Sequence, residues 1–231
     1  MRPHRNSITK HSTQATWIFL LLLNLSVPGL AADTHPITGR RYAGVMGVGG
    51  APWLERAERE DEERPKAAVR LLKLKPGMVV GDVGAGSGYY TELIAKQVGP
   101  AGKVYATDIQ PGMIDLLRQR IGRAKLTNVE ALLSTEDDSR LPDAALDLII
   151  LVDVYHEFSE PQKMLRQLRA ALKPGGLLVL LEFRKEDPSV PIRAEHKMSV
   201  AEVRAELEPE GFHFDKVLPD LPWQHMLYFH K

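Results

Sequence analysis

The sequence predicts an α/β fold: a doubly wound, mostly parallel seven-stranded sheet with a C-terminal antiparallel hairpin. The first observation is that short apolar or β-branched runs alternate with amphipathic stretches from residue 75 onward. That alternation is typical of a parallel sheet covered on both faces. The second observation is that only PDLP separates HFDKVL from WQHMLYFHK. So short a link can join antiparallel strands but cannot make a parallel crossover, so we expect five parallel strands and then a hairpin.

Each expected strand or helix is a short run of residues whose apolar positions follow the spacing typical of that element. The expected parallel strands are residues 78–82, 103–108, 129–133, 146–153 and 176–183. The amphipathic stretches that follow strands, with apolar residues at helical spacing, are residues 91–98, 113–121, 161–172 and 199–208. The hairpin strands are residues 213–218 and 223–231. Together these elements assign residues 75–231 to one α/β domain.

Residues 1–32 are expected to be a secretory signal peptide rather than part of the fold. Basic residues and no acidic one precede the apolar run of residues 17–27, and PGLAAD follows it. A basic start, a short apolar run and small residues before an acid are the parts of such a signal. The run is shorter than the ~18 residues that span a bilayer, so no membrane insertion is expected beyond this segment. Cleavage near Ala31 or Ala32 predicts a periplasmic or secreted protein, although an uncleaved signal would tether it.

Composition excludes several function classes. The 231-residue chain has 30 Lys and Arg against 30 Asp and Glu, so it lacks the global positive field that gathers nucleic acid. It also has no cysteine, which removes disulfides, thiolate metal ligands and thiol nucleophiles together. Any chemistry therefore uses oxygen or nitrogen groups or a cofactor, and no nucleic-acid partner is expected.

Residues 33–74 are expected to form an N-terminal lead-in followed by a helical segment. The lead-in contains the glycine-rich stretch GRRYAGVMGVGG, residues 39–50. Alternating charges in ERAEREDEER, residues 55–64, favour a solvated helix face, because such charges support one another in water. Pro65 can open a second helix, since its missing N–H is harmless at the first helical position.

The stretch GDVGAGSGYY, residues 81–90, is a glycine-rich turn where the first expected strand meets the first expected helix. Glycines there let a ligand approach the backbone, and the helix N-terminus supplies unpaired N–H groups. A nucleotide-like ligand is the natural occupant, and a purely structural tight turn is the alternative. A nicotinamide fingerprint requires G-x-G-x-x-G, but Tyr89 stands where its third glycine belongs. An acid followed by G-x-G-x-G is instead satisfied from Asp82 to Gly88.

This pattern resembles motif I of the class I S-adenosylmethionine-dependent methyltransferases, which have a Rossmann-like fold. The resemblance extends from about Glu55 to the C-terminus: LDLIILVDVYHEF resembles motif IV at the fourth strand, and LKPGGLLVLLEF resembles the turn and fifth strand that follow. It implies that residues 75–231 bind S-adenosyl-L-methionine. The cofactor-binding residues that it implies are Asp82, Gly84, Gly86, Gly88, Asp108, Thr135, Glu136 and Asp153.

Asp108 and Thr135 each have an alternative interpretation. Asp108 ends the second expected strand, where the family has an acid that holds the ribose hydroxyls. A carboxylate can accept from two vicinal hydroxyls at once, and a helix-capping Asp is the alternative interpretation. After the third strand many relatives place an acid against the adenine amino group, where this chain has Thr135. Glu136, a neighbouring acid or backbone groups can serve there instead, and a solvated acidic loop is the alternative.

The chemistry that the resemblance implies asks little of the protein, because the sulfonium methyl is already activated. The enzyme aligns a nucleophile and, where needed, removes its proton. The candidate catalytic residues are His156, an imidazole that titrates near neutrality, and Asp153, which by resemblance lines the methionine end of the cofactor. Tyr155, Glu157 and His196 are candidate substrate contacts. The alternatives are that His156 and Glu157 cap the following helix and that His196 lies on the surface. No metal site is expected, because His156, Glu157 and His196 lack the usual ligand spacing.

The expected function is methyl transfer to a small-molecule acceptor through an O, N or C nucleophile. The tetrapeptide Asp-Val-Tyr-His that ends at His156 lacks the Asn/Asp-Pro-Pro-aromatic run of enzymes that methylate amide or exocyclic base nitrogens. The alternative is an exported protein that binds S-adenosylmethionine or a nucleoside without turnover, because the cofactor is made in the cytosol. A translation start at Met46 would instead remove the signal and give a cytoplasmic enzyme.

Overall fold

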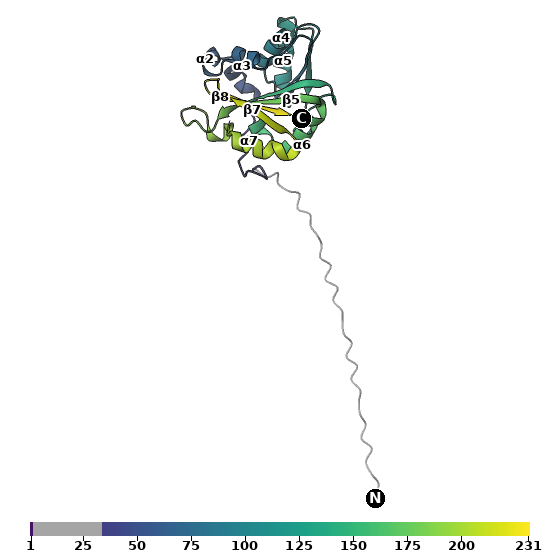
Figure 1. Cartoon of the computed structure of the whole chain (residues 1–231), viewed down its shortest axis with the longest axis vertical. Helices are drawn as coiled ribbons and strands as arrows, with labels where there is room; N and C mark the ends of the chain where they lie inside the picture. The colour runs from purple at the N-terminus through teal and green to yellow at the C-terminus, as the bar shows by residue number, and fades with distance from the viewer. Residues whose placement is uncertain (2–33) are drawn as a thin grey trace. The chain divides into compact units, whose positions relative to one another are not determined.

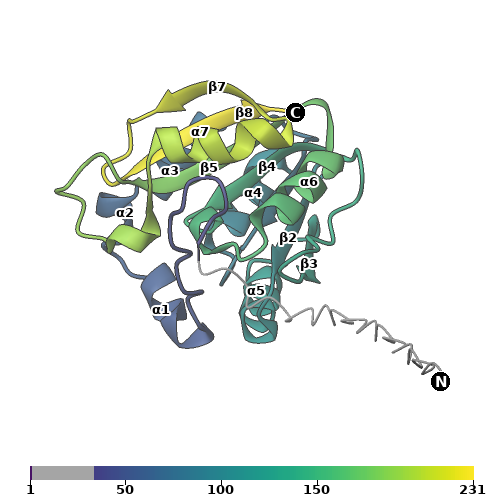
Figure 2. The ribbon, with the colours of Figure 1, turned by 90° about the horizontal axis from the view of Figure 1, so that it is seen from below.

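A central β-sheet organises the part of the chain that the computed structural model describes, Met1 and residues 34–231. Helices cover both faces of this sheet within the unit Ala31–Lys231 (Figures 1 and 2). Apart from Met1, the predicted signal peptide of residues 1–32 lies outside the described residues. None of the described helices combines the length and the apolar character needed to cross a membrane.

The sheet is mostly parallel with an antiparallel C-terminal pair, which confirms the predicted fold class. Its strands are β1 (Val79–Val83), β2 (Lys103–Asp108), β3 (Val129–Leu133), β4 (Leu146–Val152), β5 (Leu172–Arg184), β6 (Lys197–Met198), β7 (His213–Leu218) and β8 (Gln224–His230). The order is β3-β2-β1-β4-β5-β8-β7, parallel as far as β5 and antiparallel beyond it. The short β6, which pairs with the end of β5, was not expected from the sequence.

Helices follow the strands as the amphipathic stretches predicted. The α-helices are α1 (Ala51–Leu54), α2 (Arg59–Glu62), α3 (Pro65–Leu71), α4 (Tyr89–Val98), α5 (Pro111–Arg123), α6 (Pro161–Ala171) and α7 (Val200–Leu207). The 3-10 helices are η1 (Val48–Gly50), η2 (Tyr155–Glu157), η3 (Ala194–His196) and η4 (Glu208–Glu210). One core cluster joins α3 and α4 to the sheet, and another joins α6 and α7 to it.

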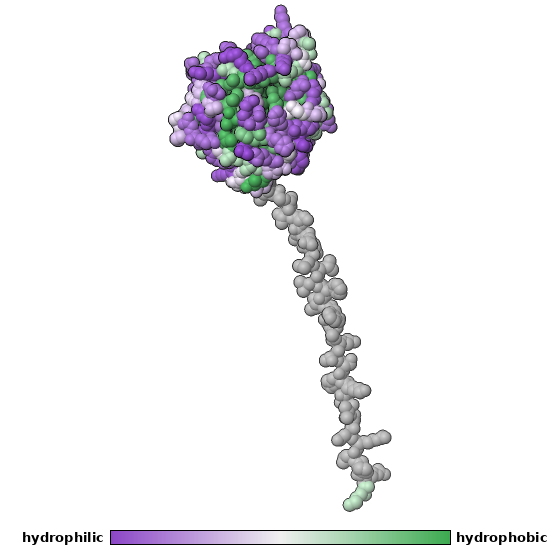
Figure 3. All heavy atoms as spheres, in the orientation of Figure 1, coloured by the Kyte–Doolittle hydropathy of each residue, from purple (hydrophilic) through white to green (hydrophobic). Residues whose placement is uncertain are grey.

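Strand β4 is apolar at every position except Asp147, because it is buried on both faces. Leu148 and Ile150 belong to the core beneath α3 and α4, whereas Ile149 and Leu151 belong to the core beneath α6 and α7. Successive side chains of a strand point to opposite faces, so a strand buried on both faces reads as a continuous apolar run. The outside of the domain is mostly hydrophilic on the side shown in Figure 3, with hydrophobic patches between the polar groups.

The charged run of residues 55–64 does not form one solvated helix face, so that prediction was wrong. Only the four residues of α2 within this run are helical, and the rest lies in the turns on either side of α2. Arg59 and Glu63 are only 4% and 1% exposed. Arg59 Nε donates to Glu63 Oε2 at 2.7 Å, as burial of two charges requires. Their spacing of four residues puts both side chains on one helical face, and tertiary packing turns that face inward. Pro65 does open α3, as predicted.

The KPGG stretch, predicted as a turn before the fifth strand, lies within β5 itself. This strand starts at Leu172, directly after α6. Its pairing with β4 shifts register between Leu146 and Leu148, and Gly175 has a φ of +75°. The glycine therefore allows a bend inside the strand rather than a separate turn.

Candidate functional site

A cavity of about 840 Å³ opens at the carboxyl ends of β1, β2 and β4. This volume is in the range of small-molecule sites. Its walls bring together nine of the predicted site residues: Gly84, Gly86, Asp108, Thr135, Glu136, Asp153, His156, Glu157 and His196. We call the part around Gly84, Gly86 and Asp108 the glycine-loop end, and the part around His156, Glu157 and His196 the histidine end.

The glycine-loop end is tied together through the carboxylate of Asp108. Its Oδ2 accepts from the Gly86 N–H at 3.0 Å, and its Oδ1 accepts from the Gln110 N–H at 2.9 Å. Burial raises the pKa of this carboxyl group, while the backbone N–H donors act in the opposite direction. Each oxygen keeps a further lone pair, so the same carboxylate can position the loop and accept from a ligand.

Glycine is required in this loop for backbone and steric reasons. Gly84 and Gly86 have φ values of +70° and +54°, a backbone conformation that residues other than glycine rarely adopt. A Cβ on Gly84 would lie 2.3 Å from Val154 Cγ2, and one on Gly86 would lie 2.8 Å from Leu54 Cδ1. The loop is therefore packed against the segment after β4 on one side and α1 on the other.

Three predicted site residues do not line the cavity. Asp82 is buried and accepts from Thr91 Oγ1 at 2.5 Å, which links β1 to α4 behind the loop. Gly88 is the N-cap residue of α4, with a φ of +84°, and faces Leu117. Tyr155 is fully buried, with its ring 5.3 Å from the guanidinium carbon of Arg40. The structure thus gives Asp82 and Gly88 supporting positions and places Tyr155 in the core rather than at a substrate wall.

Asp153 lines the cavity between the two ends. Its Oδ2 accepts from Gln224 Nε2 at 2.5 Å, whereas its buried Oδ1 has no hydrogen-bond partner among the described residues. Burial and the nearby carboxylates of Glu63 and Glu182 raise its pKa well above the ordinary value, and Arg59 opposes them. A buried acceptor without a partner marks a place where a ligand donor or cation fits.

Sequence reasoning missed Arg59 and Glu63, which also line the cavity, and Gln224. The first two stand in a charged run whose pattern matches a solvated helix, so only their spacing of four residues could have suggested a common face. Gln224 follows the hairpin turn at the start of β8, and no sequence signal connects it to Asp153.

Thr135 and Glu136 are exposed where they line the cavity. Thr135 Oγ1 donates to Asp137 Oδ1 at 2.9 Å, and Glu136 Oε2 accepts from Ser159 Oγ at 2.7 Å. The acidic loop after β3 therefore borders the cavity, with its hydroxyl and carboxylate groups partly engaged by neighbouring side chains.

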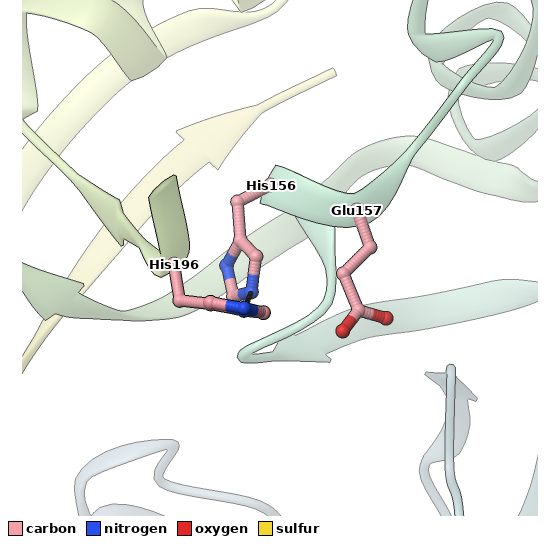
Figure 4. A group of neighbouring side chains, drawn as sticks. All are labelled: His156, Glu157 and His196. Carbon is pink, nitrogen blue, oxygen red and sulfur yellow. Dashed lines mark hydrogen bonds between the residues drawn. The ribbon is translucent and has the colours of Figure 1, made fainter. Parts of the chain in front are cut away.

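At the histidine end, Glu182, His156 and His196 form a chain of polar side chains from three separate elements. His156 of η2 is buried, and its Nδ1 lies 2.6 Å from Oε2 of Glu182, a fully buried residue of β5. A carboxylate partner holds the proton on Nδ1 and leaves Nε2 as the acceptor nitrogen. That Nε2 lies 3.2 Å from Nδ1 of His196 in η3, and Figure 4 shows the two rings meeting edge to face.

Glu157 completes this end on the cavity side of η2. Its Oε1 accepts from the Met46 N–H at 3.2 Å, and burial raises its pKa to about 7. Burial and the neighbouring His156 lower the pKa of His196. His156, Glu157 and His196 each offer a ligand atom within 4.8 Å of the others, although the sequence spacing gave no reason to expect a cluster.

The lead-in holds the histidine end in place through the backbone. The carbonyl oxygen of His156 accepts from the Ala43 N–H at 3.1 Å and from Arg40 Nη1 at 3.0 Å. Arg40 is paired in turn with the fully buried Glu206 of α7, with Nε 2.8 Å from Oε1. The segment before the α/β domain is thus part of the site.

Comparison with known proteins identifies the family. A family model described as "Methyltransferase domain" matches residues 81–180. The ubiquinone/menaquinone biosynthesis C-methyltransferase UbiE of Hydrogenovibrio crunogenus is 34% identical over 124 residues, which cover 51% of this chain and 47% of that protein. A protein-L-isoaspartate O-methyltransferase of Methanothrix thermoacetophila is 33% identical over 110 residues, 48% of this chain and 50% of that protein. The matches thus span about half the length of these curated relatives.

Solved structures also resemble this chain, and one at more than 30% identity is matched over nearly its whole length. The crystal structure of a SAM dependent methyltransferase from Aquifex aeolicus superimposes with a TM-score of 0.76 at 32% identity, and the match covers 80% of this chain and 99% of that one. The sequence match, the order of the strands and the glycine loop therefore all indicate the same family. The chain belongs to the class I S-adenosylmethionine-dependent methyltransferases, and its cofactor is S-adenosyl-L-methionine.

Proposed function

We propose that the protein transfers a methyl group from S-adenosylmethionine to a small-molecule acceptor bound at the histidine end. One observation carries this proposal: a single cavity connects the glycine-loop end to the histidine end and passes the unpartnered oxygen of Asp153. A cofactor bound at the first end and an acceptor bound at the second would meet inside it.

The residues of the glycine-loop end fit the cofactor chemically. Asp108 has lone pairs left for the ribose hydroxyls, and Gly84 and Gly86 leave the backbone bare where a ligand approaches. The unpartnered Asp153 Oδ1 suits the ammonium group at the methionine end of the cofactor. S-adenosylmethionine, when bound, supplies an electrophilic methyl group. The chain contributes alignment and exclusion of water.

The acceptor side combines an apolar wall with the histidine cluster. The wall includes Val154, Phe158, Met164, Phe183 and Ile192, which suit a flat or aliphatic body. Because Glu182 engages Nδ1 of His156, Nε2 is the nitrogen left to take a proton, and it faces His196. We propose His156 as the proton acceptor, acting directly or through His196. The C-methyltransferase relatives, named for ubiquinone and menaquinone biosynthesis, favour a phenol or quinol among the candidate acceptors.

Calorimetric titration of S-adenosylmethionine tests the cofactor site. Gly86→Val should weaken binding by at least about 100-fold, because it forces a branched residue into a left-handed backbone conformation at a cost of ~1–3 kcal/mol. Its side chain would also collide with Leu54 and displace the loop that lines the cavity. Gly122→Val is the matched control, since Gly122 has open space around its Cβ position and no positive φ. Equal binding by parent and Gly86→Val would show that the pocket is assigned wrongly.

Turnover tests the acceptor side. The parent, incubated with methyl-labelled cofactor and a pool of small phenols, quinols and amines, should label at least one acceptor. His156→Ala should then lower the transfer rate by roughly 10² to 10⁴ while cofactor affinity stays nearly unchanged. Cofactor binding without transfer to any member of the pool would favour a binding protein over an enzyme.

A further inference from the structure

We propose that His156, Glu157 and His196 bind a divalent transition-metal ion at the histidine end of the cavity. The donor atoms are Nε2 of His156, Nδ1 of His196 and a carboxylate oxygen of Glu157. The claim that the site binds metal stands independently of methyl transfer, whereas the ion's role in activating an acceptor rests on the proposed function.

The distances between the donors fit a common ion. Two nitrogens bound tetrahedrally at about 2.0–2.1 Å from an ion lie roughly 3.3 Å apart. Nε2 of His156 and Nδ1 of His196 are 3.2 Å apart. The carboxylate of Glu157 lies within 4.8 Å of the histidine donors, and Figure 4 shows it on the same side of η2 as the ring nitrogens. A side-chain rotation of this half-buried residue closes the remaining gap.

The surroundings of His156 are those of a metal ligand. A metal-binding histidine usually donates its second N–H to a carboxylate, which fixes the tautomer and the ring orientation. Glu182 does this at 2.6 Å from Nδ1, and its other oxygen accepts from the Tyr155 N–H at 3.1 Å. The carboxylate is therefore immobilised on both sides and holds Nε2 of His156 toward His196.

The donor set indicates the kind of ion and its purpose. Two imidazoles and one carboxylate suit zinc, iron or cobalt, whereas magnesium and calcium prefer oxygen ligands. All three residues line the cavity, so the ion keeps open positions on the cavity side. There it would bind a hydroxyl or enol oxygen of the acceptor and lower the pKa of that group, so that its proton is lost to solvent water. With the ion bound, Nε2 of His156 is a metal ligand and no longer the proton acceptor.

A direct hydrogen bond between the imidazoles accounts for the same 3.2 Å distance without a metal. In that arrangement His196 Nδ1–H donates to His156 Nε2, and Glu157 stays with the Met46 N–H. The two interpretations differ in one respect: only a metal site makes the affinity for an added ion depend on both His196 and Glu157.

A titration with Co²⁺ alone distinguishes the metal site from the direct hydrogen bond. The full-length protein is titrated, and visible absorption is recorded. We expect d–d absorption bands from one tightly bound ion, displaced by Zn²⁺ but not by Mg²⁺. His196→Ala and Glu157→Gln should each weaken Co²⁺ binding by at least about tenfold. His213→Ala, which removes an exposed imidazole on β7, is the matched control and should bind Co²⁺ like the parent.

The same samples distinguish failure of this inference from failure of the proposed function. Circular dichroism confirms that each variant is folded, and calorimetry with S-adenosylmethionine reports on the glycine-loop end. Absence of the absorption bands in a parent that binds cofactor would overturn the metal site and leave methyl transfer standing. Equal Co²⁺ affinity in His196→Ala, Glu157→Gln and His213→Ala would overturn it as well. Loss of cofactor binding in a parent that holds Co²⁺ would instead count against the proposed function alone.

Discussion

The two ends of the cavity are built in different ways. The glycine-loop end uses consecutive residues of one strand–turn–helix unit, residues 81–90, and one carboxylate from the adjacent strand. The histidine end draws on the lead-in, η2, β5 and η3, which are far apart in the chain. An end assembled from sequence neighbours is specified by a short motif, whereas an end assembled from distant segments depends on how those segments are fastened together.

The fastening of the histidine end is a buried ion pair. Glu206 of α7 is fully buried and accepts from Arg40 through both oxygens and from Thr38 Oγ1. Arg40 also donates to the His156 carbonyl oxygen. The glycine-loop end is held without such an ion pair, because backbone N–H groups of the loop donate to the Asp108 carboxylate and to the Thr107 carbonyl oxygen of β2.

The largest expected effect comes from breaking this fastening. Arg40→Met should lower the free energy of unfolding by about 3–5 kcal/mol, because it leaves the carboxylate of Glu206 buried without its cationic partner. Urea denaturation followed by circular dichroism measures this. The double variant Arg40→Met/Glu206→Met removes both charges and should recover most of the loss. If the double variant is no more stable than the single one, the ion pair does not fasten the histidine end in this way.

A pH experiment probes the glycine-loop end at Asp82. Burial, the largest cause, and the nearby Asp108 raise the pKa of this carboxyl from 3.8 to about 6, against the opposing effects of Thr91 and Arg59. The folded protein therefore holds this proton more tightly than the unfolded chain. The resulting stability is fully present below about pH 4 and is lost as the pH rises through about 6.

The variant Asp82→Asn has no carboxyl group that titrates at this position. Comparing it with the parent therefore isolates the contribution of Asp82 to the free energy of unfolding. The stability of the variant relative to the parent should increase by about 2–3 kcal/mol between pH 4 and pH 7. Urea unfolding at each pH gives the difference, with the exposed Asp143→Asn as the matched control. A difference that does not change with pH would mean that Asp82 is not a buried titrating group beneath the loop.

The smallest expected effect is at the helix start that follows the histidine end. Ser199 caps α7: its Oγ accepts from the Glu202 N–H at 3.1 Å, and Glu202 Oε2 accepts from the Ser199 N–H at 3.0 Å. Ser199→Ala should cost about 1 kcal/mol, or about 2–4 °C in Tm for a domain of this size. S-adenosylmethionine affinity should not change, and a clear loss of it would show that the two ends are more strongly coupled than their construction indicates.

The sequence predicted the sheet and the glycine loop well for a specific reason. Alternation of short apolar runs with amphipathic stretches is set by strand and helix periods of two and 3.6 residues, so it is readable without tertiary information. The hairpin followed from the length of the PDLP link alone. The two-residue β6 has no such pattern, because it forms only where the chain passes the end of β5.

Burial of charged and polar residues was the part that the sequence did not reveal. Arg59 and Glu63 share the pattern of a solvated helix, yet both line the cavity. Tyr155, next to His156 in the chain, points into the core instead of toward a substrate. Neighbouring residues of a turn point in different directions, so sequence proximity to a motif does not assign a side chain to the cavity.

By itself, the sequence determined the α/β fold, the glycine loop and the carboxylate at the end of β2, because each depends on residues close together in the chain or on a repeated period. Only the tertiary structure brought His196 to 3.2 Å from His156, set Glu182 behind that ring and anchored the lead-in on α7. The physical reason is that a side chain's neighbours across long sequence separations depend on how the elements pack. Packing of the whole chain selects those neighbours, and no local pattern encodes them.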